Sequence, residues 1–333
     1  MQKEQDCIRH LTEGKGEFYM LKVALVGVGA ISGAHIPAWM AMEDVELVAL
    51  CDVRPEQMEK YPKQRHYTDF DQMLASETLD IVDICLPTYL HVEFARKAMQ
   101  RGIHVLCEKP ISLHRADVEP LYALAKEKNV RYMVAHVVRF WPGYEALKEI
   151  YDTKKYGKLI SGTMQRLGQF PQWSWNNWMQ KEECSGMVPF DLHIHDLDFL
   201  VYAFGIPKDK VVFRAKRSDS DFLNITYDFG DFFVQTQASW YATKAHPFTA
   251  CYSFQFEDAL VEFREERLKI YLRDGGVIDS GGEAGALGAI DLPQTDAYAN
   301  EIRYFTDCVE NGTDCEKVRA EELAAVLDIL NNV

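Results

Sequence analysis

Residues 21–33 read Leu-Lys-Val-Ala-Leu-Val-Gly-Val-Gly-Ala-Ile-Ser-Gly, an apolar strand that ends in a glycine turn and opens into a helix. Gly27 permits the tight turn, and Gly29 lets the backbone come close to a phosphate. The N–H groups and the positive dipole end of the following helix attract an anion. The segment therefore predicts a site for the pyrophosphate of a dinucleotide, with Ser32 in place of the third glycine of the usual G-x-G-x-x-G pattern.

A second apolar run, Leu47–Cys51, ends in Asp52, 25 residues after Gly27. A carboxylate at this position accepts hydrogen bonds from the adenosine ribose hydroxyls and repels a 2′-phosphate, so we expect NAD over NADP. Arg54 favours NADP instead, because a guanidinium binds a 2′-phosphate. The alternative interpretation is that these glycines and Asp52 are ordinary turn residues.

Composition limits the class of protein. The chain has 333 residues with 47% hydrophobic content, which suffices for about two domains. Its formal net charge of −15 argues against binding to nucleic acid or to an anionic membrane. We therefore expect a small-molecule ligand of modest charge.

Cysteine usage predicts a reducing, cytoplasmic environment, because no C-x-x-C pair is present and several cysteines lie in strand-like runs. The eight cysteines are Cys7, Cys51, Cys85, Cys107, Cys184, Cys251, Cys308 and Cys315.

Neither the beginning of the chain nor its most apolar stretch predicts a membrane segment. Residues 1–20 are charged and have no apolar core, so we interpret them as an N-terminal extension and not a signal peptide; Met20 is an alternative start. The run 23–42 is interrupted by glycines, His35 and Pro37, which fits a strand, turn and helix better than a membrane span.

Strands and helices alternate through residues 21–138, which predicts an α/β Rossmann domain with a doubly wound parallel sheet. The expected elements are a helix at 70–75 capped by Asp69, strand 79–86, helix 89–101, strand 103–107, helix 113–128 and strand 131–137. Ligands of such sheets gather beyond the carboxyl ends of the strands, where Gly27, Asp52, Pro87 and Lys109 fall.

Residues 139–333 have a different pattern and form a second predicted domain, in which long strand-like runs are expected to pair antiparallel. Strands are predicted at 223–229, 232–240 and 248–256, hairpin turns at 228–231 and 257–258, a glycine-rich loop at 275–288, and helices at 298–310 and 320–331. These last helices can pack back on the first domain.

Two clusters offer acid-base chemistry. Glu108-Lys109-Pro110 follows a strand end, where an ammonium can orient and polarise a reacting hydroxyl, although a salt-bridged surface lysine is the ordinary alternative. On a helix, Asp191 and His195 share a face, whereas His193 and His195 point in nearly opposite directions. This spacing favours an acid-base pair over a zinc site, so no metal is expected.

Aromatic residues in the second half are candidates for substrate contact. The segment Trp173-Ser-Trp175-Asn-Asn-Trp178 offers aromatic faces for the C–H faces of a sugar and amides for its hydroxyls, the alternative being a packed loop. Arg139, Arg166 and His193 are further candidates, and His193 has the alternative of a packed core residue.

Together these residues resemble the Gfo/Idh/MocA family of NAD(P)-dependent oxidoreductases, over nearly the whole chain from about residue 21. The motifs are Gly27 to Ser32 with His35, Pro87-Thr88-Tyr-Leu-His91, Glu108-Lys109-Pro110, and Asp191 with His195 after Ser185-Gly186. Met187 stands where the family often has a second glycine. The resemblance implies that Lys109, Asp191 and His195 form the catalytic set. The expected cofactor-binding residues are Gly27, Gly29, Ala30, Ile31, Asp52, Arg54, Pro87, Thr88, His91, Glu108 and Lys109.

The resemblance further implies hydride transfer between a nicotinamide cofactor, NAD with NADP possible, and a secondary hydroxyl of a sugar, sugar derivative or cyclitol. His195 is then the general base, Lys109 polarises the oxygen and Asp191 orients the pair. The second half is then an α/β domain with a large open, mostly antiparallel sheet that binds substrate, and a homodimer or homotetramer is expected. Two alternatives stay open: an NAD-dependent glycosidase on the same scaffold, and a non-catalytic NAD-binding sensor.

Overall fold

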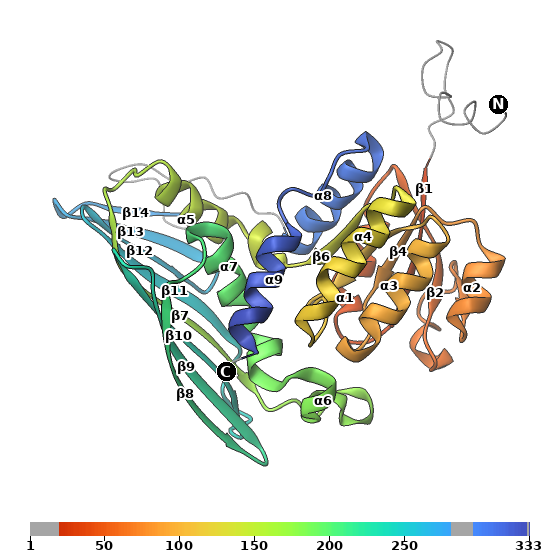
Figure 1. Cartoon of the computed structure of the whole chain (residues 1–333), viewed down its shortest axis with the longest axis horizontal. Coiled ribbons are helices and arrows are strands. Elements are labelled where there is room, and N and C mark those ends of the chain that lie inside the picture. Colours follow the sequence, from red (N-terminus) through yellow and green to blue (C-terminus); the bar gives the residue numbers. More distant parts are fainter. Residues whose placement is uncertain (1–19, 281–295, 332) are drawn as a thin grey trace, which may run out of the picture.

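Six parallel strands form the first sheet of the computed structural model, which describes residues 20–280, 296–331 and 333 (Figure 1). Their order is β3-β2-β1-β4-β5-β6, so the chain starts at the centre of the sheet and winds outward in both directions, which confirms the doubly wound prediction. The strands are β1 Leu21–Val26, β2 Val45–Cys51, β3 Arg65–Tyr67, β4 Ile81–Ile84, β5 His104–Glu108 and β6 Tyr132–Ala135.

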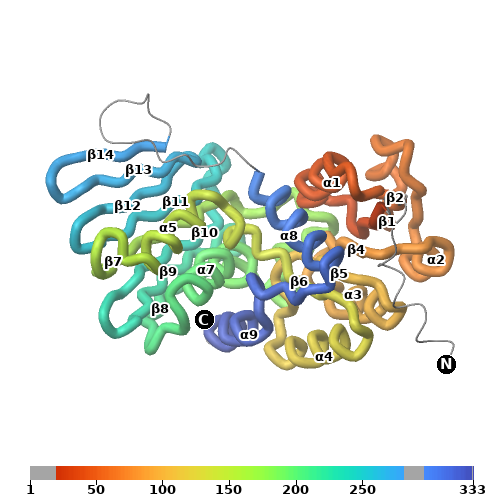
Figure 2. Tube along the Cα trace, turned by 90° about the horizontal axis from the view of Figure 1, so that it is seen from above, coloured from red at the N-terminus to blue at the C-terminus, as the bar shows by residue number. Residues whose placement is uncertain are grey.

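Helices cover both faces of this sheet because its central strands are buried on both sides (Figure 2). The helices are α1 Ser32–Met40, α2 Phe70–Ser76, α3 His91–Gln100 and α4 Val118–Lys128. The expected cap of α2 is present, since the Asp69 carboxylate accepts a hydrogen bond from the Gln72 N–H at 2.7 Å.

The second sheet has eight strands in the order β14-β13-β12-β11-β7-β10-β9-β8. All neighbours are antiparallel except β7 and β10, which confirms a mostly antiparallel sheet with hairpins at 228–231 and 257–258. Its strands are β7 Leu159–Gln169, β8 Asp209–Arg217, β9 Ser220–Asp228, β10 Phe233–Tyr241, β11 Thr249–Phe256, β12 Ala259–Arg264, β13 Arg267–Leu272 and β14 Val277–Asp279.

Helices α5 (Pro142–Asp152) and α7 (Ile194–Phe204) lie on the side of this sheet that faces the first domain, and the short α6 (Glu182–Ser185) follows β7 (Figure 1). The C-terminal helices α8 (Ala297–Asn311) and α9 (Ala320–Leu330) turn back between the two sheets (Figures 1 and 2). Helix α8 packs on α1, where Arg303 pairs with Asp44 at 2.6 Å.

Three predicted elements need correction. The strand expected at 131–137 ends at Ala135, because the chain enters a 3₁₀ turn at Val137–Phe140 that buries Arg139. The helix expected at 113–128 begins only at Val118, after a 3₁₀ turn at Arg115–Asp117. Part of the expected loop 275–288 is strand β14, since Val277 and its neighbours pair with β13.

The remainder of that loop, 281–288, lies outside the described residues, as do residues 1–19 with Cys7. The seven cysteines that the structure describes are free thiols. Across the described ranges, no helix combines the length and the apolar character that crossing a membrane requires.

The turn between β12 and β13 holds two glutamates in the left-handed region. Arg264 pairs with Arg267, and the connecting Glu265 and Glu266 have φ angles of 53° and 58°. Two-residue hairpins with this geometry prefer Asn-Gly, because a left-handed residue with a Cβ costs about 1–2 kcal/mol.

We therefore predict that Glu266→Gly raises the free energy of unfolding by about 1 kcal/mol, measured by urea denaturation. Glu266→Ala is the matched control, because it removes the same charge and retains the Cβ. A gain of equal size in both variants would contradict the backbone explanation and indicate a charge effect.

Candidate functional site

The carboxyl ends of β1, β2, β4 and β5 open into a cavity of about 880 Å³ that the second domain closes from the other side. Most of the residues expected at the site line it. From the first domain they are Gly27, Gly29, Ala30, Ile31, Asp52, Arg54, Pro87, Thr88, Glu108 and Lys109. From the second domain they are Trp173, Trp175, Trp178, Asp191 and His195.

The glycine turn fits a pyrophosphate. Gly27 has φ +93°, and a Cβ there would lie 2.6 Å from the Cys85 carbonyl oxygen, so only glycine fits. A Cβ on Gly29 would meet nothing within 4 Å, which leaves room above the turn for a ligand. Helix α1 starts at Ser32 without a side-chain cap and without an acidic residue in its first turn, so the positive end of its dipole is not neutralised and can attract an anion.

Asp52 lies directly after β2 and is held from two sides. Its Oδ2 accepts the Val28 N–H at 2.8 Å, and the Arg54 guanidinium donates to both carboxylate oxygens at 3.0 and 3.1 Å. The guanidinium carbon lies 5.8 Å from the centre of the Trp175 ring. Asp52, which favours NAD, and Arg54, which favours NADP, therefore form an ion pair in this structure.

Lys109 reaches across to the second domain. It follows β5, is joined to Pro110 by a cis peptide bond, and donates from its ammonium to the Asp191 carbonyl oxygen at 2.7 Å. The same nitrogen lies 3.3 Å from Asp191 Oδ1. Asp191 sits in a π-helical turn, Pro189–His193, an irregularity that is frequent at functional sites.

His195 occupies the first turn of α7 and lines the same cavity. Burial and the nearby Lys109 ammonium hold the pKa of His195 well below its ordinary value, so the imidazole is neutral at pH 7. Among the described residues, its Nδ1 has no hydrogen-bond partner. A neutral imidazole beside an ammonium supplies a proton acceptor next to a group that stabilises negative charge.

His91 and His193 do not reach the cavity. The His91 ring nitrogens lie 2.7 and 2.8 Å from the carbonyl oxygens of Pro110 and Leu86, so this histidine fastens the loops after β5 and β4 and is not a direct cofactor contact. His193 stacks on Tyr227 and bonds its hydroxyl at 2.7 Å, which makes the packed alternative the correct interpretation.

The two arginine candidates are also wrong as cavity-lining residues. Arg139 is fully buried between Asp198 on α7 and Glu322 on α9. Arg166 is buried against Asp196 at 2.8 Å. A buried guanidinium must be paired, and these carboxylates hold both side chains in the core between elements.

Three tryptophans, Trp173, Trp175 and Trp178, line the cavity. Trp175 stacks near Arg54 at the end of β2, which lies three strand spacings, about 14 Å, from β5 and Lys109. Trp175 therefore lies nearer to the end of the cavity where the adenosine is expected than to Lys109. Trp173 and Trp178 remain candidates for substrate contact.

Sequence reasoning missed Tyr298, which lines the cavity from the first turn of α8. Its phenol is protonated at neutral pH and can donate a hydrogen bond, and burial raises its pKa further. No motif surrounds this residue, and only the return of α8 over the first domain brings it to the site.

Glu301, one turn after Tyr298, is a buried carboxyl below the site. Among the described residues neither of its oxygens has a hydrogen-bond partner. Burial and the neighbouring Glu108 raise the pKa of Glu301 well above its ordinary value, so the folded protein holds this group neutral.

We predict that Glu301→Gln becomes progressively more stabilising, relative to the parent, as pH rises from about 4.5 to 8. The unfolded chain releases the Glu301 proton in this range while the folded chain keeps it, so the parent loses up to about 1.4 kcal/mol per pH unit between the two pKa values. Urea unfolding at several pH values measures this, with exposed Glu127→Gln as control. A difference that does not change with pH would contradict it.

Comparisons with known proteins agree with this geometry. A family model described as "Oxidoreductase family, NAD-binding Rossmann fold" matches residues 21–136, and the GFO/IDH/MocA C-terminal domain model matches residues 144–277. D-apiose dehydrogenase of Paraburkholderia graminis is 30% identical over 188 residues, 55% of this chain and 50% of the relative, so the chain spans about half the length of such relatives.

Two further proteins extend the similarity to most of the chain. The scyllo-inositol 2-dehydrogenase (NADP(+)) of Bacillus subtilis is 24% identical over 313 residues, 89% of this chain and 79% of the relative. The structure of a levoglucosan dehydrogenase in complex with NADH and levoglucosan has a TM-score of 0.80 at 18% identity and covers 94% of this chain and 95% of that one. At this identity the structural match establishes the fold.

Proposed function

From the premise that the chain belongs to the Gfo/Idh/MocA family of oxidoreductases, we propose that it transfers a hydride between a nicotinamide cofactor and a secondary hydroxyl of a sugar, sugar derivative or cyclitol. The observation that carries this proposal is the convergence of Lys109, Asp191 and His195 in one cavity with the glycine turn. The dehydrogenases of D-apiose, scyllo-inositol and levoglucosan support the substrate class by similarity.

The cofactor would be held along the carboxyl ends of the strands. Gly27, Gly29 and the first turn of α1 would bind the pyrophosphate, and Asp52 would accept the adenosine ribose hydroxyls. When bound, the nicotinamide supplies the hydride acceptor or donor. The protein residues do the remaining work of binding, orienting and proton transfer.

Alcohol oxidation removes a hydride from carbon and a proton from oxygen, leaving a carbonyl. Neutral His195 accepts the hydroxyl proton, and the Lys109 ammonium stabilises the negative charge that develops on the oxygen. Asp191 holds that ammonium through its carbonyl and carboxylate oxygens, so the nitrogen is already oriented before substrate binds.

The test is incubation with NAD or NADP and a panel of sugars, sugar acids and inositols, followed by nicotinamide absorbance. Net reduction with one or more polyols is the expected result. Release of a glycoside without net reduction would favour the glycosidase alternative. Binding of NAD with no turnover on the panel would favour a sensor.

We predict that Lys109→Ala and His195→Ala each reduce turnover on the order of a hundredfold or more, while NAD affinity changes little. The base must be unprotonated, so the rate rises with pH through its pKa, and the lowered pKa of His195 puts this acid limb below pH 6.5. The limb should vanish in His195→Ala. A near-parent rate in that variant would exclude His195 as the base.

We predict that the parent binds NAD more tightly than NADP and that Asp52→Ala narrows or reverses this ratio. Removing the carboxylate relieves repulsion of a 2′-phosphate and frees the Arg54 guanidinium to bind it. Fluorescence titration with both cofactors measures the ratio. Adding Arg54→Gln to Asp52→Ala should weaken NADP again, and an unchanged ratio in both variants would refute the assignment.

We also propose a homodimer or homotetramer in the cytoplasm, formed through the outer face of the second sheet. Val211, Phe213 and Phe233 share this face by strand register and are 54%, 68% and 51% exposed. Light scattering should give a multiple of 38.2 kDa, and Phe213→Glu with Phe233→Glu should lower the mass. Met40→Glu, equally exposed on α1, is the control, and a monomeric parent would refute the proposal.

A further inference from the structure

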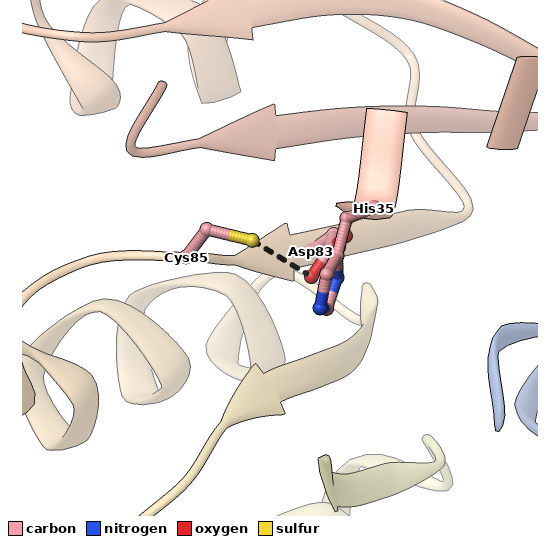
Figure 3. Close-up of side chains that lie close together, drawn as sticks. All are labelled: His35, Asp83 and Cys85. Atoms are coloured by element: carbon pink, nitrogen blue, oxygen red, sulfur yellow. Dashed lines mark hydrogen bonds and ion pairs between the residues drawn. The ribbon is translucent and has the colours of Figure 1, made fainter. Parts of the chain in front are cut away.

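His35 is a fully buried histidine in α1 that lies below the cavity and does not line it. Its Nδ1 is 2.8 Å from Asp83 Oδ2 on β4, and its Nε2 is 3.0 Å from Glu108 Oε1 at the end of β5. Figure 3 shows the ring of His35 reaching down from its helix to Asp83, with Cys85 beyond the carboxylate. One imidazole therefore joins two neighbouring strands of the sheet.

The two contacts determine the charge of the ring. Ionised carboxylates only accept hydrogen bonds, so these two contacts fit a ring that carries a proton on both nitrogens, an imidazolium between two carboxylates. Burial, the largest cause, lowers the pKa of His35, but Asp83 and Cys85 together outweigh it and raise the pKa well above the ordinary value. Trp39 donates to the same Asp83 oxygen at 2.7 Å, and the Tyr298 ring lies 5.7 Å from the imidazole. Within the described ranges, Cys85 and neutral Glu301 are further titratable neighbours of the ring.

A metal site is the other use of this cluster, because donor atoms of His35, Asp83 and Cys85 lie within 4.8 Å of one another. The chemistry of the donors opposes it. The shared Asp83 oxygen already accepts an indole N–H, which a cation would repel. Burial and Asp83 raise the pKa of the Cys85 thiol to about 12, so it is not a thiolate ligand at neutral pH.

Glu108 carries the effect of His35 to the site. One of its oxygens is bound by His35, and the other accepts the backbone N–H of Lys109 at 3.0 Å. Burial, the largest cause, would raise the pKa of Glu108, but the hydrogen bond and charge of His35, together with the Lys109 ammonium, outweigh it and lower the pKa, which keeps the carboxylate ionised. The carboxylate thus holds the backbone of the residue whose ammonium meets Asp191.

We propose that His35 is a positioning residue: its imidazolium fixes Glu108, and Glu108 fixes the backbone of Lys109 at the carboxyl end of β5. This assignment rests on the proposed function for its effect on turnover, because Lys109 is the group it positions. The charge of His35 and its effect on Lys109 are properties of the folded chain and can be measured without substrate.

The first experiment is ¹⁵N NMR of the histidine rings in the full-length protein. Both nitrogens of His35 should carry protons at pH 8, and in Glu108→Gln the ring should lose one of them at a lower pH than in the parent. A neutral His35 ring in the parent at pH 8 would overturn the proposal. This measurement needs no variant of His35 and no substrate.

The second experiment is His35→Gln, whose single amide group cannot donate to both carboxylates in the same way. Exchange of the Lys109 amide hydrogen should become about tenfold faster or more, and kcat should fall about tenfold or more while the Kd for NAD changes less than about threefold. His104→Gln is the matched control, because His104 accepts a hydrogen bond from Arg131 at the opposite end of the same strand. Unchanged Lys109 exchange, or equal acceleration in the control, would overturn the proposal.

These readouts separate two kinds of failure. If the parent turns over no polyol but the His35 ring is doubly protonated and Lys109 exchange responds to His35→Gln, the proposed activity fails and the positioning role stands. If turnover is present and neither kcat nor Lys109 exchange responds, the activity stands and the positioning role fails.

Discussion

The contact of the Lys109 ammonium with Asp191 is the interaction on which the site depends, because it joins the two domains at the point where they share the cavity. Lys109 is placed by the end of a buried strand, and Asp191 by a π-helical turn before α7. Lys109 follows a strand of the first sheet and Asp191 belongs to the second domain, so no single sheet holds both residues. The geometry of this contact therefore requires that the two sheets keep one fixed position relative to each other.

Buried ion pairs help to fix that position. Arg139, in the turn after the last strand of the first sheet, binds Asp198 on α7 and Glu322 on α9. Because a buried guanidinium without its partners costs several kcal/mol, this network strongly favours one arrangement of the three elements. The sequence suggested Arg139 as a substrate-binding residue. Its guanidinium is buried between α7 and α9, so it holds these elements together instead.

Sequence reasoning succeeded where the determinants were local. Gly27, Asp52 and Lys109 follow predicted strands, and parallel strands bring their carboxyl ends to one edge, so their common location follows from topology. It failed where the determinants were long-range. Tyr298 reaches the cavity only because α8 returns over α1, and the partners of Arg139 lie 59 and 183 residues away along the chain. Periodicity and spacing carry no information about such contacts.

The position of Met187 shows how a departure from the family pattern can be absorbed. Gly186 and Met187 both have positive φ, 68° and 59°, which explains why glycine suits this pair of positions. The Met187 side chain is buried, and its N–H donates to Ser185 Oγ at 3.0 Å, so packing and a hydrogen bond offset the backbone cost.

The cavity is built from two kinds of segment, regular elements and an irregular loop. Lys109 follows a strand end and His195 lies at the start of a helix, whereas another part of the cavity wall belongs to an irregular segment in which Asn176 and Asn177 have φ angles of 49° and 53°. Rigid elements position groups accurately, and loops change shape and length with little effect on the fold. We therefore assign the proposed hydride transfer to the scaffold, and the choice of substrate in that proposal to the part of the cavity wall that contains Trp173 and Trp178.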